Sequence, residues 1–500
     1  MKGPDRLAVG RFIATWWLPA VIACAVGALY VCYSVAQWRA LVAPSWDLGI
    51  FAEAVQAYSR FEAPIVPIKG PGYNLLGDHF HPILALLGPI FRLFPSALTL
   101  LVVQDLLIAA SVLPIARLAQ RLLGRGGALL VGLAYGLGWG LQGAVGAQFH
   151  EVCVAVPLLA FGGAAFVERR WGACMAWLAP LVLVKEDLGL TVFVAGLALA
   201  WRRRGEGRPA VLRSIAYALF GIVAFVLTVK VLLPAMNPAG TWAYSLDGAA
   251  TGAGTPTGGT TAARAIPSLW DILTTPSVKL VTLIVLAAGA GFVGTASPWF
   301  ALVAPTLAWR FAGSVESYYG WDSWHYNAVL VPIAACSLLD LIDQWLAPER
   351  TAAETDADAE DDAPASSNLG WRVAAWAVAC VPAASLALTA SSLPLWHLPD
   401  LKEDPRMAAA LGALDAVPEG VSVETDTTLL ARLVPGREVY WVGTTGTMDT
   451  PPEYVVIDGR SYAWGDQEVD AESWGSAAHP GHSYETVYAK QGFRVARRTS

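Results

Sequence analysis

The sequence has 500 residues, of which 55% are hydrophobic and only 15% are charged, and its mean hydropathy is +0.48. Globular domains carry about 25% charged residues, so this composition excludes a single soluble domain. The formal net charge of -7 gives no reason to expect a nucleic-acid partner. The six cysteines form neither a CxxC pair nor a disulfide framework. The chain is therefore predicted to be a polytopic membrane protein, in contact with membrane lipids.

Apolar runs predict about eleven membrane-spanning helices, since each crossing needs about 20 residues. The first run, 12–35, follows a basic N-terminal segment and ends near a small-residue stretch that would suit a signal peptidase. The run is too long for a signal core and further spans follow, which favours an uncleaved first helix. The other predicted spans are 98–122, 127–147, 152–167, 172–186, 187–201, 211–236, 278–296, 298–313, 325–347 and 371–392.

Arginine residues cluster at alternate ends of these spans, and this asymmetry predicts the orientation. The ends assigned to the cytoplasm contain Arg117, Arg121, Arg125, Arg169, Arg170, Arg202, Arg203, Arg204, Arg208 and Arg372. This places the N-terminus in the cytoplasm and residues 396–500 outside. The acidic stretch 349–368 is then expected to be a disordered cytoplasmic linker.

Besides the linker 349–368, two segments are not expected to span the membrane. Residues 37–97 form a long outer loop, in which 47–61 has the pattern of an amphipathic helix lying on the membrane. The apolar stretch 82–95 is too short to cross. Residues 396–500 predict a small extracytoplasmic α/β domain, with strands at 421–424, 438–442, 454–458 and 493–497 and helices at 405–416 and 483–491. The predicted fold is thus a mainly α transmembrane bundle, residues 1–395, followed by this domain.

Polar residues that map to the outer side fall in five separate segments of the chain. These are Asp47; Asp78, His79 and His81; His150 and Glu151; Lys185, Glu186 and Asp187; and residues 316–326, which include Trp321, Trp324, His325 and Tyr326. Ionisable groups in or near a bilayer are costly and usually functional. We expect the five segments to converge on one outward-opening cavity.

Most of these groups also have a purely structural explanation. Asp47 begins the amphipathic segment and would serve as its N-cap. Asp78, His79 and His81 would suit a divalent metal ion or a hydrogen-bonded loop. His150 and Glu151 would cap an interfacial helix.

The triplet Lys185, Glu186 and Asp187 lies between two apolar arms that are each too short to cross a ~30 Å core. It is therefore expected in a water-filled cavity rather than in lipid.

Cationic and aromatic side chains on this side suggest a phosphate and a sugar. Arg60, Lys69, Lys185 and Arg310 are candidates for binding a phosphate or pyrophosphate. The aromatic residues between 318 and 326 form part of an interfacial belt or stack on sugar rings. No phosphate-binding glycine loop and no hydrolase nucleophile motif occurs in a plausible context, so the sequence does not support cytoplasmic nucleotide chemistry.

Several ordered motifs resemble a bacterial family of membrane proteins that is catalogued as a domain of unknown function. They are SWDLGIFAEAV (45–55), IKGPGYNLLGDHFHPILALL (68–87), FHEVCVAVPLLA (149–160), LVLVKEDLGLTV (181–192) and the WHYNAVLVP region (324–332). The family is similar in plan to GT-C glycosyltransferases, which use lipid-phosphate sugar donors. The resemblance implies a catalytic acid in the first outer loop, at the position of Asp47.

Three functions remain as hypotheses. The first is a glycosyltransferase that moves a sugar from a polyprenyl-phosphate donor to a cell-envelope acceptor. Asp47, Asp78 or Glu151 would supply its carboxylate. Lys185, or a divalent metal ion on Asp78, His79 and His81, would receive the phosphate. The second is a transporter or lipid flippase coupled through Lys185, Glu186 and Asp187, and the third is a noncatalytic envelope scaffold.

Overall fold

The computed structural model describes residues 4–237, 268–313, 315–322, 324–356, 369–446 and 448–500. The chain divides into two compact units. The helical unit contains residues 1–28, 107–144 and 152–393, and the mixed unit contains residues 29–106, 145–151 and 394–500. The long loop after the first helix is thus grouped with the C-terminal residues.

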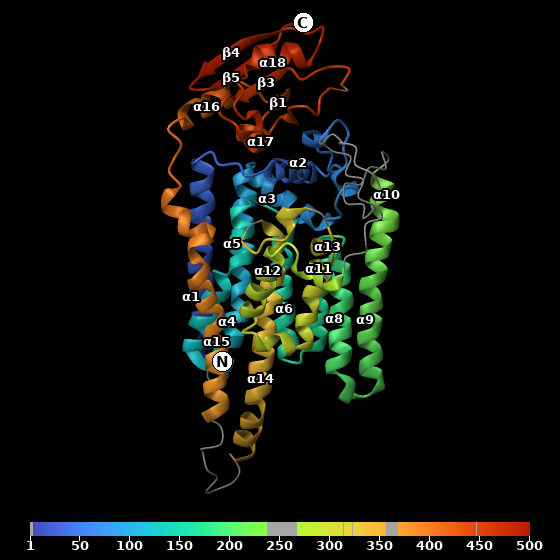
Figure 1. The fold of residues 1–500 in the computed structure, drawn as a ribbon, viewed down its shortest axis with the longest axis vertical. Coiled ribbons are helices and arrows are strands. Elements are labelled where there is room, and N and C mark those ends of the chain that lie inside the picture. The colour runs from blue at the N-terminus through green and yellow to red at the C-terminus, as the bar shows by residue number, and fades with distance from the viewer. Residues whose placement is uncertain (1–3, 238–267, 314, 323, 357–368, 447) are drawn as a thin grey trace. The chain divides into compact units, whose positions relative to one another are not determined.

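The helices carry most of the fold (Figure 1). Their bounds are α1 Pro4–Arg39, α2 Asp47–Ser59, α3 Gly88–Leu93, α4 Ala97–Gly136, α5 Trp139–Gly146, α6 Ala155–Val167, α7 Trp171–Leu178, α8 Leu188–Arg202, α9 Arg208–Leu227, α10 Leu233–Met236, α11 Leu269–Thr274, α12 Val278–Gly289, α13 Ala304–Ala312, α14 Leu330–Asp356, α15 Leu369–Thr389, α16 Met407–Asp415, α17 Thr427–Leu433 and α18 Ala471–Ala478.

Within the described residues, five helical segments are long and apolar enough to cross a membrane. They are Ala14–Arg39, Ala97–Gly146, Arg208–Met236, His325–Ala347 and Leu369–Ser392. Shorter apolar helices follow the other predicted spans, for example Glu151–Val167, Trp171–Leu183, Leu188–Arg202 and Val278–Gly289. The chain is therefore a helical membrane protein, but the structure does not confirm a count of eleven spans.

Within the longest of these segments, α4 itself consists of two helical arms, because the chain reverses direction at Gly124. This glycine has φ 72° and ψ -168°, which ends the first helix. A Cβ atom at Gly132 would lie 3.0 Å from that of Ala116, and one at Gly136 would lie 3.1 Å from Val112. Residues at equal distances before and after Gly124 therefore meet, as in an antiparallel hairpin. This confirms the predicted pair of helices at 98–122 and 127–147.

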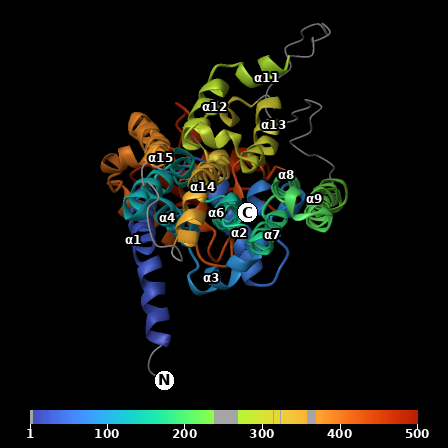
Figure 2. The same ribbon diagram turned by 90° about the horizontal axis from the view of Figure 1, so that it is seen from below.

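Two kinds of helix surface distinguish the helical unit. α14 is a central helix whose side chains, such as Leu338 and Ile342, are fully buried. α9 instead exposes Leu219, Val223 and Val226, as expected of a surface that faces lipid. Helices α8 and α9 lie side by side in both views (Figures 1 and 2).

Ion pairs join the helix ends that were assigned to the cytoplasm. Arg121 pairs with Asp343 at 3.1 Å, and Arg202 pairs with the fully buried Asp340. Arg117 at the end of the first arm of α4 pairs with Glu168, which follows α6. These contacts place the ends of four helices on one side of the helical unit, as the alternating orientation requires. Which side of the membrane they face remains a prediction.

Cysteine labelling should test this orientation. In a variant without native cysteines, Gly459→Cys should react with a membrane-impermeant maleimide in intact cells, whereas Gly205→Cys should react only after the membrane is permeabilised. Both positions are exposed, so accessibility within the folded protein does not limit either reaction. Labelling of Gly205→Cys alone in intact cells would reverse the predicted topology.

The acidic stretch 349–368 differs in part from its prediction. Helix α14 continues to Asp356, so the first residues of this stretch are helical rather than irregular. Alanine and glutamate, which favour helices, predominate in this part of the stretch. The remaining residues, 357–368, lie outside the described part of the chain.

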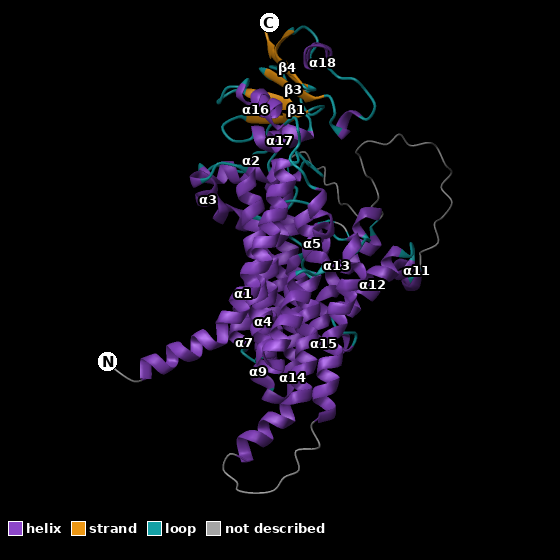
Figure 3. Cartoon of the chain, turned by 90° about the vertical axis from the view of Figure 1, so that its left-hand side faces the viewer, coloured by secondary structure: helices purple, strands orange, loops and turns teal. Residues whose placement is uncertain are grey.

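The mixed unit contains all the strands of the described chain (Figure 3). They are β1 Ser422–Thr425, β2 Glu438–Trp441, β3 Tyr454–Asp458, β4 Tyr484–Lys490 and β5 Phe493–Arg498. The sheet has the order β2-β1-β3-β5-β4. β1 is parallel to β2 and β3, and β5 is antiparallel to β3 and β4. The four strands predicted from the sequence are all present.

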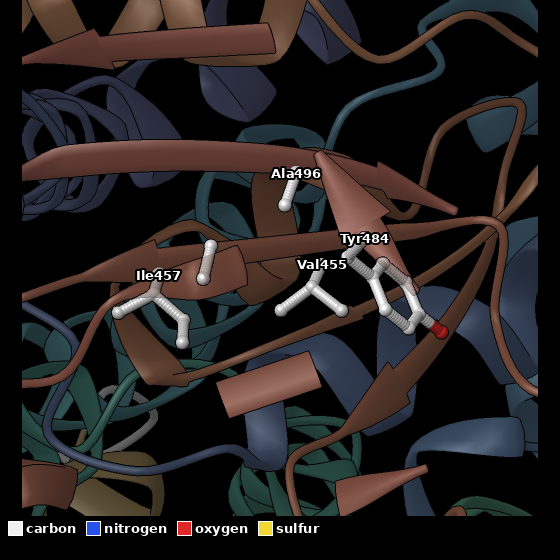
Figure 4. Close-up of a cluster of buried hydrophobic side chains, with 5 residues drawn as sticks. Val455, Ile457, Tyr484 and Ala496 are labelled. Carbon is white, nitrogen blue, oxygen red and sulfur yellow. The ribbon is translucent and has the colours of Figure 1, made fainter. Parts of the chain in front are cut away.

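The segment 483–491 is strand β4, so the prediction of a helix there is wrong. Tyr484, Thr486 and Tyr488 alternate along it, and aromatic and β-branched residues at this spacing favour a strand. Gln491 and Gly492 both have positive φ angles, as a tight hairpin turn requires. Tyr484 then packs with Val455, Ile457 and other side chains in the core of the domain (Figure 4).

Helix α2 was predicted at 47–61 and is present at Asp47–Ser59, but its environment differs. Its side chains are buried on more than one face, and the buried residues include Leu48, Phe51, Glu53 and Val55. α2 is thus a core helix of the mixed unit rather than a helix lying on the membrane. The exposed apolar residues that would contact lipid belong to the second predicted stretch, where Leu86 is 72% and Leu93 is 75% exposed.

Candidate functional site

Asp47 is the first residue of α2, but it does not cap the helix. The N-cap residue is Trp46, whose side chain makes no cap hydrogen bond, and the Ser45 hydroxyl accepts from the backbone N–H of Asp47 at 3.3 Å. The Asp47 carboxylate instead accepts a 2.9 Å hydrogen bond from the Ser45 hydroxyl. It also lies 3.2 Å from Nε2 of His150, a residue 103 positions away in the sequence. The N-cap explanation of Asp47 is therefore wrong.

A buried amide network holds His150 in place. Gln104 of α4 accepts a hydrogen bond from the backbone N–H of His150 and donates one to the carbonyl of Gln148, both at 3.0 Å. Gln148 has φ 70°, an unusual backbone conformation for a residue with a side chain. Its side-chain amide donates to the carbonyl of Val42. The segment before α6 is thus bonded both to α4 and to the link between α1 and α2.

These contacts determine how the His150 ring can hold its protons. Nδ1 lies 3.2 Å from the carbonyl of Gln148, and because a carbonyl can only accept, Nδ1 must carry a hydrogen. Nε2 then faces the Asp47 carboxylate, so one further proton must lie between the two groups. An aspartate–imidazolium pair and an aspartic acid–imidazole pair both satisfy this geometry.

The surroundings of Asp47 favour its charged form. Burial raises the pKa of this carboxyl, but the hydrogen bonds from His150 and Ser45 and the charge of His150 outweigh it, so that its pKa is lowered. The negative charge of Glu151 opposes this effect. The Asp47 side chain is 31% exposed and His150 only 4%. The site thus presents an ionised carboxylate to solvent and supports it from behind with a buried ring.

Lys69 and Asp78 form a second charged pair in the same unit. Lys69 Nζ lies 2.6 Å from Asp78 and 5.0 Å from the centre of the Tyr73 ring. Burial lowers the pKa of Lys69, but the charge of Asp78 more than offsets it, so that the pKa is raised and the ammonium stays protonated. Lys69 is 24% exposed and Asp78 is 8% exposed. The exposed member of the pair is therefore the cation.

The predicted metal ligands Asp78, His79 and His81 are not arranged as a metal site in the structure. Across the described residues, no group of three or more His, Cys, Asp and Glu side chains is arranged to hold a metal ion. The Asp78 carboxylate is bonded to Lys69, and the buried His81 ring packs edge-on against Phe51 at 5.6 Å. A divalent metal ion at these three residues therefore stays a prediction, and no step is assigned to it.

The predicted triplet at 185–187 belongs to the helical unit, whereas Glu151 is buried in the mixed unit. Lys185, Glu186 and Asp187 lie at the bend before α8, as predicted, and Asp187 accepts a 2.9 Å hydrogen bond from the Trp309 indole. Glu186 is buried, while Lys185 and Asp187 are half-buried. The triplet thus lies within the packed unit and not on its outer surface.

Aromatic side chains surround Trp309 in the helical unit. Tyr326 packs against Tyr318 at 4.6 Å and against the buried His325 at 4.1 Å. Trp321 and Trp324 are half-buried in the same loop. A role of these rings in binding sugar stays a prediction.

Arg310 and Arg60 differ from the expected phosphate ligands. Arg310 is fully buried, and its guanidinium donates to the carbonyls of Tyr318 and Gly320 and to Asn327. These bonds give Arg310 a structural role, and they leave no support for the expected role in binding a phosphate. Arg60 lies at the surface in an exposed pair with Glu62 at 2.8 Å, an arrangement that gives no support to a bound phosphate.

Glu53 is a residue of the site region that the sequence analysis missed. It lies in the middle of α2 and is only 4% exposed. One carboxylate oxygen accepts from the backbone N–H of Ile68, which precedes Lys69, and the other accepts from Val439 in β2. The sequence does contain a signal for this residue, because Glu53 lies among the apolar residues of FAEAV. Buried acids are rare unless they are paired, so an acid in such a run indicates a specific partner.

Glu53→Gln should change how stability depends on pH. Burial raises the pKa of Glu53 well above its ordinary value, and its two N–H bonds offset only part of this effect. The folded protein therefore keeps this proton to a higher pH than the unfolded chain, which releases it near pH ~4.3. Stability must then decrease as the pH rises above that value. Glutamine cannot titrate, so the variant should lose less stability than the wild type between pH ~5 and pH ~8.

Thermal unfolding of the purified protein at both pH values measures this difference. The variant should also be less stable at the lower pH by about 1–3 kcal/mol, because an amide leaves one buried N–H without an acceptor. Glu62→Gln is the control, since this exposed side chain should keep the wild-type pH slope. Equal slopes for wild type and Glu53→Gln would contradict the prediction.

One family model and two solved structures are similar to this chain. A family model described as "Predicted membrane protein (DUF2079)" matches residues 38–495. No curated protein matches the chain. Two solved structures of ArnT from Cupriavidus metallidurans are similar at 16% identity and a TM-score of 0.45. The apo form covers 97% of this chain and 98% of its own, and the form bound to undecaprenyl phosphate covers 95% and 97%. The family match confirms the resemblance seen in the motifs: the chain belongs to the DUF2079 family of predicted membrane proteins.

Proposed function

We propose that this protein is a membrane glycosyltransferase that moves a sugar from a polyprenyl-phosphate donor to an acceptor outside the cytoplasm. The observation that carries the proposal is the partly exposed Asp47 carboxylate at 3.2 Å from His150, in a loop between membrane-spanning helices. The resemblance of the motifs around Asp47 to a family with a GT-C-like plan supports the same reaction class.

In the proposed reaction the acceptor hydroxyl attacks the anomeric carbon of the donor sugar. The bond from this carbon to the phosphate oxygen breaks, and the polyprenyl phosphate leaves with the electron pair. Asp47 accepts the proton of the hydroxyl, as a general base does. The lowered pKa of Asp47 means that this base is ionised at neutral pH and needs no prior deprotonation.

Lys69 is the proposed partner of the phosphate. Its ammonium is charged, partly exposed and already oriented by Asp78 and Tyr73. A phosphate that approaches the exposed side of Lys69 would gain a charge-assisted hydrogen bond. Glu53 holds the backbone of Ile68, so the position of the neighbouring Lys69 depends on α2. The base and the cation are therefore linked through one helix.

Mass spectrometry of a strain that lacks this protein tests the proposal. The strain should accumulate a sugar-linked polyprenyl phosphate and should lack one sugar on an envelope glycan, and the wild-type gene should restore both. Lys69→Met should reproduce the accumulation, whereas Lys402→Met, at a lysine elsewhere in the mixed unit, should complement normally. Unchanged lipid-linked sugars and unchanged glycans in the deletion strain would exclude this function.

A further inference from the structure

Helix α2 has a second buried face, which the C-terminal residues cover. Trp46, Gly49, Glu53 and Gln56 follow the helical spacing of one face. Asp47 and Phe51 lie on the other face, where they contact His150. The two faces of α2 therefore have different roles. One carries the candidate base Asp47, and the other packs against the sheet of the C-terminal residues.

The contacts on the second face follow the chain direction of β2. The ring of Trp46 packs edge-on against Trp441 at 5.3 Å. Further along α2, the Glu53 carboxylate accepts from the N–H of Val439 at 3.2 Å, and Gln56 accepts from that of Gly436 at 3.1 Å. The strand thus runs antiparallel to α2, and its carboxyl end lies at the end of α2 that carries Asp47.

Open α/β sheets bind ligands at the carboxyl ends of their parallel strands. The preferred position lies between two adjacent strands whose following connections go to opposite sides of the sheet. In this sheet that position lies between β1 and β3, because the chain passes from β1 to β2 on one side and from β3 to β4 on the other. The chain leaves β1 through Asp426 into Thr427 and Thr428 at the start of α17. The carboxyl end of β2 in this sheet is therefore turned toward the start of α2.

A small crevice lies where α17, which follows β1, meets the start of α2. Its walls include Ser45, Leu48 and Gly49 from one segment and Thr427, Thr428 and Arg432 from the other. Ser45 connects the crevice to the candidate base, since its hydroxyl donates to Asp47. The crevice thus combines hydroxyl groups and apolar carbon. Trp46, which follows the lining residue Ser45, packs against Trp441, and both rings are half-buried but do not themselves line the crevice.

We propose that this end of the sheet is the acceptor-binding wall of the Asp47 site, and that the acceptor is a saccharide. Hydroxyl groups on Ser45 and Thr428 can exchange hydrogen bonds with sugar hydroxyls, and an indole ring offers a flat apolar surface to the C–H face of a sugar ring. The inference rests on the proposed glycosyltransferase function and assigns Trp441, a residue of the C-terminal domain, to acceptor binding.

The test measures saccharide binding directly. Oligosaccharides are released by mild acid hydrolysis from the envelope of the deletion strain, and the fraction retained by the full-length immobilised protein is quantified by mass spectrometry. Trp441→Ala should weaken retention by about tenfold, the equivalent of ~1.4 kcal/mol. Thr428→Val should weaken it by roughly twofold to tenfold, as expected for one lost hydrogen bond. Trp396→Ala, at a 63% exposed ring of the same unit, should retain saccharides normally.

Two further variants separate the possible failures. Trp441→Phe keeps an aromatic ring and should bind better than Trp441→Ala, which excludes misfolding as the cause of lost binding. Asp47→Asn should still retain saccharides while it loses transfer. Absence of retention by the wild type, or equal retention by wild type and Trp441→Ala, would overturn the inference. If transfer is absent but retention still depends on Trp441, the saccharide site stands and the proposed reaction fails.

Discussion

Asp47→Asn should reduce glycosyl transfer by roughly 10²–10⁴-fold while leaving the fold intact, since this is the usual cost of removing a general base. The substitution keeps the shape of the side chain and removes only its charge and its capacity to accept a proton. Transfer is measured with purified protein, a radiolabelled polyprenyl-phosphate sugar and the saccharide fraction of the deletion strain. Of the changes considered for this protein, this one has the largest expected effect on activity.

The hydrogen bonds around Asp47 explain why the fold should survive its replacement by asparagine. The side-chain amide of the variant can donate to Nε2 of a neutral His150 ring, whose Nδ1 hydrogen still bonds the carbonyl of Gln148. Ser45 has a hydroxyl that can accept as readily as it donates. No helix cap is lost, because the Asp47 side chain does not cap α2 in the wild type.

Two companion variants sharpen the result. Asp400→Asn changes a 79% exposed carboxylate of the same unit and should transfer normally. His150→Gln removes the interactions that hold down the pKa of Asp47. The acid limb of the pH–rate profile should then move to higher pH, because the base becomes protonated more easily. Near-normal transfer by folded Asp47→Asn protein would move the catalytic role to Asp78 or Glu151.

The sequence predicted the membrane helices and most of the strands because their signals are local. Apolar runs marked the spans, and Gly124 between two of them marks the reversal. The prediction of a helix at β4 is wrong because the exposed face of this strand carries the apolar Val487 and Ala489, so that polarity does not alternate along the sequence although burial does. The long-range pairing with β5, which stabilises it, cannot be read from a local pattern.

The candidate site could be predicted only in part, for a similar reason. Asp47 and His150 were both selected as polar residues in outer segments, but their contact depends on a 103-residue separation that only the fold closes. Glu53 was not selected, because its partners are backbone N–H groups, which have no sequence signal. Arg310 was selected for its charge, and its burial by the loop 318–327 was not evident from the sequence.

Replacement of Arg310 should therefore reduce stability rather than phosphate binding. Its guanidinium is fully buried and donates to Tyr318, Gly320, Tyr326 and Asn327, at 2.7 to 3.3 Å. Removing the guanidinium leaves these buried oxygens without their donor, and each buried polar group left unsatisfied typically costs about 1–3 kcal/mol. Arg310→Met should accordingly lower the apparent Tm of the purified protein by roughly 5 °C or more.

Arg310→Lys distinguishes geometry from charge, because lysine keeps the charge but cannot reach several acceptors at once. It should be less stable than the wild type and more stable than Arg310→Met. Arg213→Met, at an exposed arginine of the same unit, should leave the apparent Tm unchanged. A stable Arg310→Met protein that had lost affinity for polyprenyl phosphate would show instead that this guanidinium can reach a ligand, and that the loop 318–327 does not need it to fold.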